Sequence, residues 1–234
     1  MKEKASLEAA LYLVATPIGN LGDISRRAIQ TLAEVDRLYA EDTRHSRKLL
    51  NHLEIDRSLI ACHEHNETGM AEEIVRNIES GQTCAMITDA GSPGISDPGF
   101  RVVRACRKAG LPVYPVPGPS AVVSALSVSG LPTDCFNFFG FLPPKRAARV
   151  RNFEENLNST ATLIYYESTH RIDKFINDAM EVFGPDRTIC LARELTKHHE
   201  TVLTGSLNEV KERFSKGSSK GEFVVMIAKE GYSL

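Results

Sequence analysis

The sequence predicts an α/β protein built of two domains. Short apolar runs alternate with longer amphipathic segments along the whole chain, a pattern typical of α/β domains with largely parallel sheets. A proline-rich junction, PVPGPSA at residues 115–121, separates two such series, and 234 residues are enough for two compact cores. We therefore expect an N-terminal α/β domain over residues 1–117 and a C-terminal α/β domain over residues 118–234.

The individual elements follow from short apolar runs, which indicate strands, and from the amphipathic segments between them, which indicate helices. In the first half we expect strands at 11–16, 37–41, 58–63, 84–90 and 112–117, and helices at 22–34, 43–53, 66–79 and 96–109. In the second half we expect strands at 135–140, 162–168, 188–194, 200–205 and 222–228, and helices at 146–157, 169–183 and 206–214.

The composition is that of an ordinary globular protein, with 42% hydrophobic and 25% charged residues. No apolar run approaches the roughly 20 residues that a membrane helix needs, so we expect no membrane partner. The five cysteines are widely spaced and form no C-x-x-C motif, which disfavours both a disulfide framework and a zinc site. Buried thiols in a reducing compartment are the simpler interpretation, and we expect a cytoplasmic protein.

The net charge of −2 disfavours a nucleic-acid binder, which usually carries a basic excess. Local clusters of basic residues are more informative than this sum. One cluster consists of Lys145, Arg146, Arg149 and Arg151, and the other of Arg44, His45, Arg47 and Lys48. Each cluster is either a solvated helix face or a set of phosphate contacts, and the sequence leaves both interpretations open.

Three loops rich in glycine and proline follow predicted strands: ATPIGNLGDIS at 15–25, DAGSPGISDPG at 89–99 and PGPSA at 117–121. Ligands of open α/β sheets bind beyond the carboxyl ends of the strands, and glycines let backbone amides approach them. Tight turns are the alternative explanation. Neither a P-loop nor a G-x-G-x-x-G motif is present, and HEH at 63–65 is the only metal-like spacing, so we expect no metal.

Several longer motifs give a closer comparison. They are LYLVATPIGNLGDISRRA, AEDTRHSRKLL, HEHNE, ITDAGSPGISDPG, PVPGPSAVVSALSVSGLP, FFGFLPPK, YYESTHR, LARELTKHHE and KGEFVVMI. Together they make the chain similar, over roughly residues 10–230, to the ribosomal RNA small subunit methyltransferase I family. This family comprises cytidine 2'-O-methyltransferases of 16S ribosomal RNA and belongs to the tetrapyrrole methylase superfamily.

The resemblance implies two α/β domains of the tetrapyrrole methylase type with a cleft between them for S-adenosylmethionine. Carried over loop by loop, it implies cofactor contacts from Pro17, Ala90, Gly91, Ser92, Ile95, Ser120, Ala121, Tyr166, Glu167, Leu195 and Gly221. It also implies a 16S ribosomal RNA or 30S subunit as the partner, and a homodimer. Because the chain stops at Leu234, just past the last predicted strand, we expect the extra C-terminal domain of some members to be absent.

Methyl transfer to a ribose hydroxyl needs in-line alignment, and a base that takes the hydroxyl proton would assist it. Our candidate catalytic residues are Glu167 and Lys197, with Glu194 and Asp42 as further carboxylates of the right chemistry. Lys197 requires a pKa lowered by its neighbours, and Glu167 has an alternative role as the ion-pair partner of Arg171, four residues on. For substrate contact we expect Arg44, His45, Arg171 and Arg193, which the resemblance places near the mouth of the cleft.

Two rival functions remain at this stage. The first is a methyltransferase of the same fold that acts on a tetrapyrrole, another small molecule or a modified protein residue. The second is a non-catalytic RNA-binding ribosome-assembly factor, which the intact glycine loops disfavour. Binding of S-adenosylmethionine separates the second rival from an enzyme.

Overall fold

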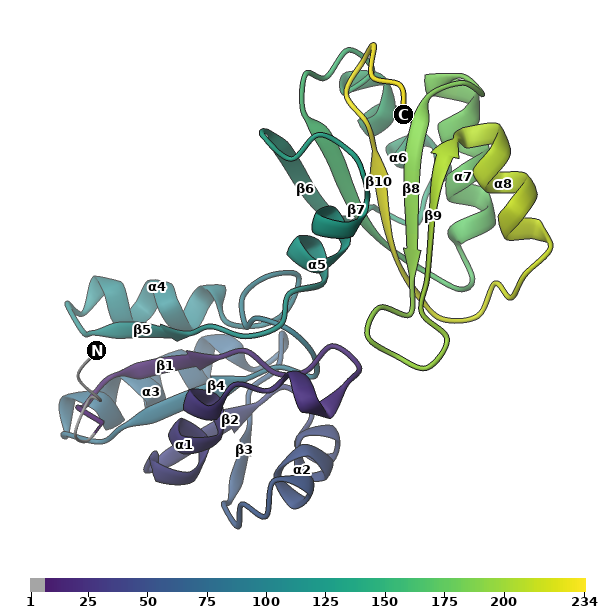
Figure 1. Ribbon diagram of the computed structural model, residues 1–234. Coiled ribbons are helices and arrows are strands. Elements are labelled where there is room, and N and C mark those ends of the chain that lie inside the picture. Colours follow the sequence, from purple (N-terminus) through teal and green to yellow (C-terminus); the bar gives the residue numbers. More distant parts are fainter. Residues whose placement is uncertain (1–6) are drawn as a thin grey trace. The chain divides into compact units, whose positions relative to one another are not determined.

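The computed structural model describes residues 7–234 and divides into two compact units, both visible in Figure 1. Unit 1 runs to Ser120 and unit 2 from Ala121 to Leu234. Each contains its own five-stranded sheet with helices packed on it, so the predicted α/β class with two sheets is confirmed. The domain boundary expected after residue 117 stays a prediction about independent folding.

Unit 1 is an open parallel sheet covered on both faces. Its strands are β1 (Leu11–Val14), β2 (Arg37–Ala40), β3 (Leu59–Ala61), β4 (Cys84–Ile87) and β5 (Val113–Val116), in the order β3-β2-β4-β1-β5. Its helices are α1 (Arg26–Glu34), α2 (Thr43–His52), α3 (Glu67–Glu79) and α4 (Phe100–Lys108), with a 3₁₀ turn, η1, at Leu21–Asp23. Every pairing is parallel, so the loops after the strands gather at one edge.

The two faces of this sheet form two separate cores because side chains alternate along each strand. On one face, Tyr12 and Val14 of β1 pack with residues of α1 and α2 such as Leu32 and Leu50. On the other face, Leu11 packs with residues of α3 and α4. Burial on both faces explains why the strands read as continuous apolar runs in the sequence.

Unit 2 is a mixed sheet, which corrects the expectation of largely parallel sheets in both halves. Its strands are β6 (Phe136–Phe141), β7 (Thr162–Ser168), β8 (Thr188–Arg193), β9 (Thr201–Ser206) and β10 (Glu222–Ile227), in the order β6-β7-β10-β8-β9. Only β6 and β7 pair in parallel. The loop 194–200 is too short to hold a crossover helix, so β8 and β9 form an antiparallel hairpin.

Three helices cover one face of this sheet, and α5 (Ala121–Val128) lies against strand β10. The three helices that cover the face are α6 (Arg146–Glu155), α7 (Ile172–Phe183) and α8 (Leu207–Ser215). The core beneath them is aromatic, since Phe153, Tyr165 and Phe175 pack with ring centroids 5.0–5.7 Å apart. A buried ion pair between Arg149 and Asp178 joins α6 to α7, so part of the predicted basic cluster at 145–151 serves the core.

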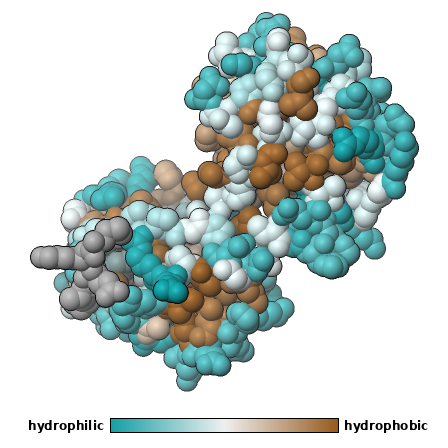
Figure 2. Space-filling view, viewed as in Figure 1, coloured by the Kyte–Doolittle hydropathy of each residue, from teal (hydrophilic) through white to brown (hydrophobic). Residues whose placement is uncertain are grey.

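Large apolar side chains also remain exposed on unit 2, where hydrophobic patches are visible in Figure 2. Among them are Val123 and Val128 of α5 and Phe136 and Phe141 of β6. Exposed apolar groups of this size commonly mark contact surfaces. They are relevant to the expected homodimer, which stays a prediction.

Several of the expected helices are shorter than the sequence pattern suggested, and two of them begin four residues late. The segment 22–34 is interrupted after η1, because Ser25 accepts a hydrogen bond from the Ala28 amide and starts α1 only at Arg26. The segment 96–109 becomes helical only at Phe100, since the preceding residue, Gly99, has a φ of 138°. Ser25 and Gly99, the residues that precede these helices, belong to loops that are part of the candidate site.

The cysteines are all free thiols, and four of them, Cys62, Cys84, Cys106 and Cys190, are buried. Cys135 is exposed. Burial raises the pKa of Cys62 and Cys84 to about 12, so these thiols stay protonated and inert.

Candidate active site

In unit 1, the loops after β1 and β4 are tied together at the carboxyl edge of the sheet. Thr16 and Gly91 exchange two backbone hydrogen bonds, of 2.9 and 3.1 Å, and the Thr16 hydroxyl donates to the Thr88 carbonyl at 3.1 Å. Gly91 has a φ of 79°, a conformation that favours glycine. These bonds hold Pro17, the residue after Thr16, against the second glycine loop.

The loop after β5 approaches the same place. A Cβ atom on Gly118 would lie 3.0 Å from the Cβ of Ala15, so only glycine allows this loop to pass so close to the end of β1. The three glycine-containing loops therefore form one surface within unit 1. It carries these predicted cofactor residues: Pro17, Ala90, Gly91, Ser92, Ile95 and Ser120.

Carboxylates lie beside this surface. The Asp89 amide donates to the Glu41 side chain at 3.4 Å, and both residues closely follow strands. Burial, followed by the charge of Glu41, raises the pKa of Asp97 to about 7, and burial raises the pKa of Glu41 as well. Our sequence reasoning missed Asp97 and Glu41, although acidic residues soon after apolar runs were a signal that could have found Glu41.

Helix α2 brings two predicted substrate residues to the same edge. Asp42 caps the helix by accepting from the Arg44 amide at 2.8 Å, and the Arg44 guanidinium pairs with the same carboxylate at 2.8 Å. This pairing holds the pKa of Asp42 well below its usual range, so the carboxylate is not a proton acceptor near neutral pH. The Arg44 side chain remains largely exposed.

His45 lines a small pocket beside these loops, within unit 1. The pocket lies between the loop after β1, helix α2 and the end of β4. Its lining residues are Pro17, Leu21, His45, Ser46, Leu49, Thr88 and Asp89. It therefore brings one predicted cofactor residue and one predicted substrate residue together.

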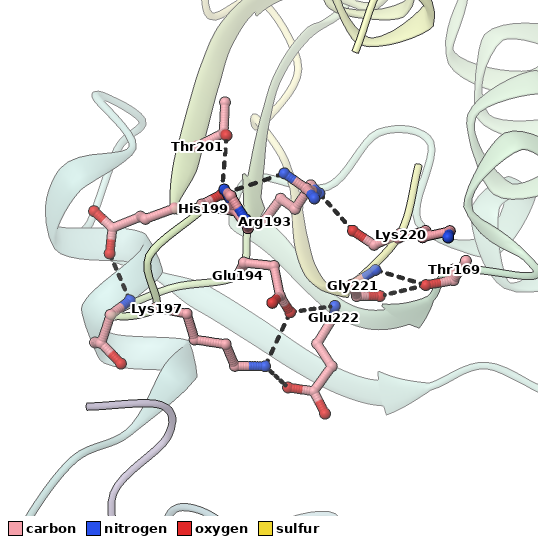
Figure 3. A network of polar contacts seen from close by, with 11 residues as sticks. Thr169, Arg193, Glu194, Lys197, His199, Thr201, Lys220, Gly221 and Glu222 are labelled. Atoms are coloured by element: carbon pink, nitrogen blue, oxygen red, sulfur yellow. Dashed lines mark hydrogen bonds and ion pairs between the residues drawn. The ribbon is translucent and has the colours of Figure 1, made fainter. Parts of the chain in front are cut away.

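In unit 2, the ends of β7 and β8 and the start of β10 meet at one edge of the sheet (Figure 3). The Gly221 amide donates to the Thr169 hydroxyl at 2.7 Å, and this hydroxyl donates to the Gly221 carbonyl at 2.8 Å. A Cβ atom on Gly221 would lie 2.6 Å from the Cγ of Glu194. The glycine is thus required by the close approach of the Glu194 side chain.

Lys197 belongs to an ion-pair network at this edge. Its ammonium lies 2.9 Å from Glu194 and 2.7 Å from Glu222, as Figure 3 shows. Burial alone would lower the pKa of Lys197, but the hydrogen bonds to the two carboxylates outweigh it and raise that pKa. The lowered pKa that a Lys197 base requires is therefore not present, and the side chain is a cation near neutral pH.

Arg193, a predicted substrate residue, braces two loops of unit 2 (Figure 3). Its guanidinium donates to the Lys220 carbonyl at 2.6 Å and to the His199 carbonyl at 3.2 Å. In the loop 194–200, the predicted cofactor residue Leu195 is buried between two residues with positive φ, Glu194 and Thr196. The loop is thus held in a fixed conformation by backbone contacts and ion pairs.

Glu167 and Arg171 form the ion pair that the sequence offered as an alternative role, with Nε and Oε1 3.3 Å apart. Glu167 Oε1 also accepts from the Ser168 amide at 2.8 Å, and Arg171 donates to the Leu142 carbonyl at 2.6 Å. Glu167 is 1% exposed, and its Oε2 has no hydrogen-bond partner among the described residues. This orphaned buried acceptor is what a ligand hydroxyl or amino group would satisfy.

Tyr166 and Ala121 complete the predicted cofactor set on unit 2. The Tyr166 ring packs against Phe138 and Phe141, with centroids 4.9 and 5.4 Å away, and Ala121 begins α5. The predicted residues thus fall into two groups, one on the loops of unit 1 and one on unit 2.

Among residues 7–234, no helix combines the length and apolar character that crossing a membrane requires. Over the same residues, no three His, Cys, Asp or Glu side chains are arranged to hold a metal ion.

Comparison with known proteins agrees with this architecture. The family model of the tetrapyrrole (corrin/porphyrin) methylases matches residues 10–211. A ribosomal RNA small subunit methyltransferase I of Xylella fastidiosa is 50% identical over 95% of this chain and 82% of its own length. One from Vibrio cholerae is 48% identical over 93% of this chain and 76% of its own.

Among solved structures, diphthine synthase superposes with a TM-score of 0.71 at 13% identity, covering 94% of this chain and 90% of its own. At that identity the likeness concerns the fold alone. The match to the family model and the identity to the curated relatives are decisive. The chain therefore belongs to the tetrapyrrole methylases and, within them, to the ribosomal RNA small subunit methyltransferase I family.

Proposed function

We propose that this protein is an S-adenosylmethionine-dependent methyltransferase that methylates the ribose 2'-hydroxyl of a cytidine in 16S ribosomal RNA. The observation that carries the proposal is its 50% identity, over 95% of the chain, to a relative named as a ribosomal RNA small subunit methyltransferase. A ribosomal substrate also makes the cytoplasm the place of action.

The glycine loops of unit 1 and the strand ends of unit 2 are suited to hold the cofactor. Support comes from the orphaned Glu167 oxygen and from loops that approach each other through glycines. When bound, S-adenosylmethionine supplies an electrophilic methyl group on a sulfonium. The residues that we propose as its contacts are Pro17, Gly91, Ser120, Tyr166, Glu167 and Gly221.

In our proposal the residues of the chain bind and orient the RNA substrate and remove the proton of its ribose hydroxyl. Glu167 Oε2 is the atom with capacity to accept a proton or a hydrogen bond, while Arg171 fixes the other oxygen. Lys197, being charged, contributes electrostatically and does not abstract a proton. Arg44 and His45 on α2 are exposed and remain our candidates for RNA contact.

Transfer of a labelled methyl group from S-adenosylmethionine to 30S subunits, compared with naked 16S ribosomal RNA, tests this function. Mapping of the modified nucleotide should show a 2'-O-methylcytidine. Binding of the cofactor without transfer to either RNA substrate would favour the rival enzyme with a small-molecule or protein substrate. No binding of the cofactor would favour the non-catalytic assembly factor.

The role of Glu167 is tested by Glu167→Gln, with Glu155→Gln on the exposed face of α6 as the matched control. If the carboxylate accepts the proton, turnover should fall about 10²–10⁴-fold with cofactor affinity retained. A loss of cofactor affinity instead would assign Glu167 to cofactor contact alone.

We further propose a homodimer, supported by the exposed apolar residues of α5 and β6. Light scattering of the purified protein measures this state directly. A monomer over the micromolar range would contradict it.

A further inference from the structure

The small pocket of unit 1 is distinct from the predicted cofactor surface. It shares Pro17 with that surface, but Ala90, Gly91, Ser92 and Ile95 do not line it. Its cavity volume is about 40 Å³, and the pocket is open to solvent on one side. Sites for whole drug-sized ligands occupy roughly 300–1,000 Å³, so this pocket can admit the polar edge of a ring that lies over its open side, but not a complete nucleoside cofactor.

Several polar groups of the pocket lack adequate partners, among them the side chains of Ser46 and Asp89. Ser46 is 2% exposed, and its hydroxyl makes no hydrogen bond in the part of the chain that the structure describes. Asp89 accepts one long hydrogen bond, 3.3 Å from the Asp42 amide. A buried hydroxyl without a partner is unfavourable, and a carboxylate with one long hydrogen bond can accept further donors. Both groups therefore favour a ligand with polar edges.

The other walls are suited to the faces of a flat ring. Pro17, Leu21 and Leu49 are apolar, and His45 adds an exposed imidazole on the first turn of α2. Flipped bases are held in this way, stacked between apolar or aromatic side chains while polar groups read their edges. The pocket thus combines apolar walls with a carboxylate and a hydroxyl.

We propose that this pocket takes the pairing edge of the base of the target nucleotide and selects cytosine over uracil through Asp89, an inference that rests on the function proposed above. A carboxylate accepts from an exocyclic amino group, and cytosine is the pyrimidine that carries one on its pairing edge. Uracil has a carbonyl oxygen at that position, which the carboxylate repels. The Ser46 hydroxyl supplies a second polar contact.

Binding of cytidine and uridine 5'-monophosphates to the full chain, followed by NMR, tests the assignment. Wild type should bind the cytidine nucleotide at least about fivefold more tightly, as one good base-edge contact provides. Asp89→Asn should remove this preference, because an amide both donates and accepts. Asp56→Asn, which removes an exposed carboxylate of the same unit, should keep it.

Ser46→Ala supplies an independent readout. Removal of an unpartnered hydroxyl should leave the melting temperature unchanged or raise it, while both nucleotides bind more weakly. A side chain with a purely structural role would not combine these two results.

The inference would be overturned by equal affinities for the two nucleotides, by no saturable binding of either, or by a retained preference in Asp89→Asn. Displacement of the cytidine nucleotide by S-adenosylhomocysteine would also overturn it, since the pocket would then belong to the cofactor. Calorimetry with S-adenosylmethionine on the same samples distinguishes a failure of the pocket assignment from a failure of the proposed methyltransferase function. If the cofactor binds and RNA is methylated while the nucleotides are not distinguished, only the pocket assignment fails.

Discussion

Replacement of Asp97 by asparagine should stabilise the protein at alkaline pH and have little effect in acid. Burial and the charge of Glu41 raise the pKa of Asp97 from 3.8 to about 7. Below pH 3.8 the carboxyl is neutral in both the folded and the unfolded chain. Between pH 3.8 and 7 the unfolded chain releases a proton that the folded chain retains, so the free energy of unfolding falls with rising pH and levels off above pH 7.

The size of the effect follows from the same shift. A rise of about three pKa units corresponds to about 4 kcal/mol, and solvent screening of this partly exposed carboxyl reduces it to about 2 kcal/mol. The neutral amide of the Asp97→Asn variant would not carry this penalty. At pH 8 the variant should therefore melt about 4–8 °C above wild type, given about 2–4 °C per kcal/mol for a chain of this size.

Scanning calorimetry of wild type and Asp97→Asn at pH 4.5, 6 and 8 measures the difference directly. Asp56→Asn, an exposed aspartate of unit 1, serves as the control for loss of a negative charge alone. A difference in melting temperature that is the same at all three pH values would refute the reasoning. A variant less stable than wild type at pH 8 would refute it as well.

Gly91→Arg should abolish binding of S-adenosylmethionine in calorimetry, whereas Gly81→Arg, also at a positive φ but in open space, should retain it. Gly221→Ala should cost about 1–3 kcal/mol in urea unfolding, because its φ is 128° and its new Cβ would meet the neighbouring glutamate, while Gly217→Ala should be nearly neutral. Asp178→Ala should lower the free energy of unfolding by about 3–5 kcal/mol, since it leaves a buried arginine unpaired. Its melting temperature, measured by circular dichroism, should fall by about 10 °C.

Local patterns in the sequence were sufficient to locate most elements. The strand β7 has the bounds predicted for it, Thr162–Ser168, because a buried run of apolar residues ends at polar ones. The pairing of β10 between β7 and β8 was not predictable in this way. Strand order depends on contacts between segments far apart in the chain, and no local pattern in residues 222–228 records its antiparallel direction.

For the candidate site, the sequence was sufficient to locate the loops but not to predict the charge states of the side chains. Glycine and proline located the loops, since Gly91 needs a positive φ and Gly118 a close approach. The charge states were not predictable, because they depend on burial and on distant partners. Lys197 is held by Glu222, which is far along the chain, and the raised pKa of Asp97 arises from burial and the charge of Glu41.

The central position of β10 affects how unit 2 can form during synthesis. Strands β7 and β8 each leave the ribosome before the strand that joins them, so their facing edges stay unpaired until residues 222–227 emerge. Unit 1, whose sheet is complete by Val116, has no such delay. The nascent chain therefore passes through a stage in which the sheet of unit 1 is complete while β7 and β8 still have unpaired edges. A chaperone that binds unfolded chains would be most useful at this stage.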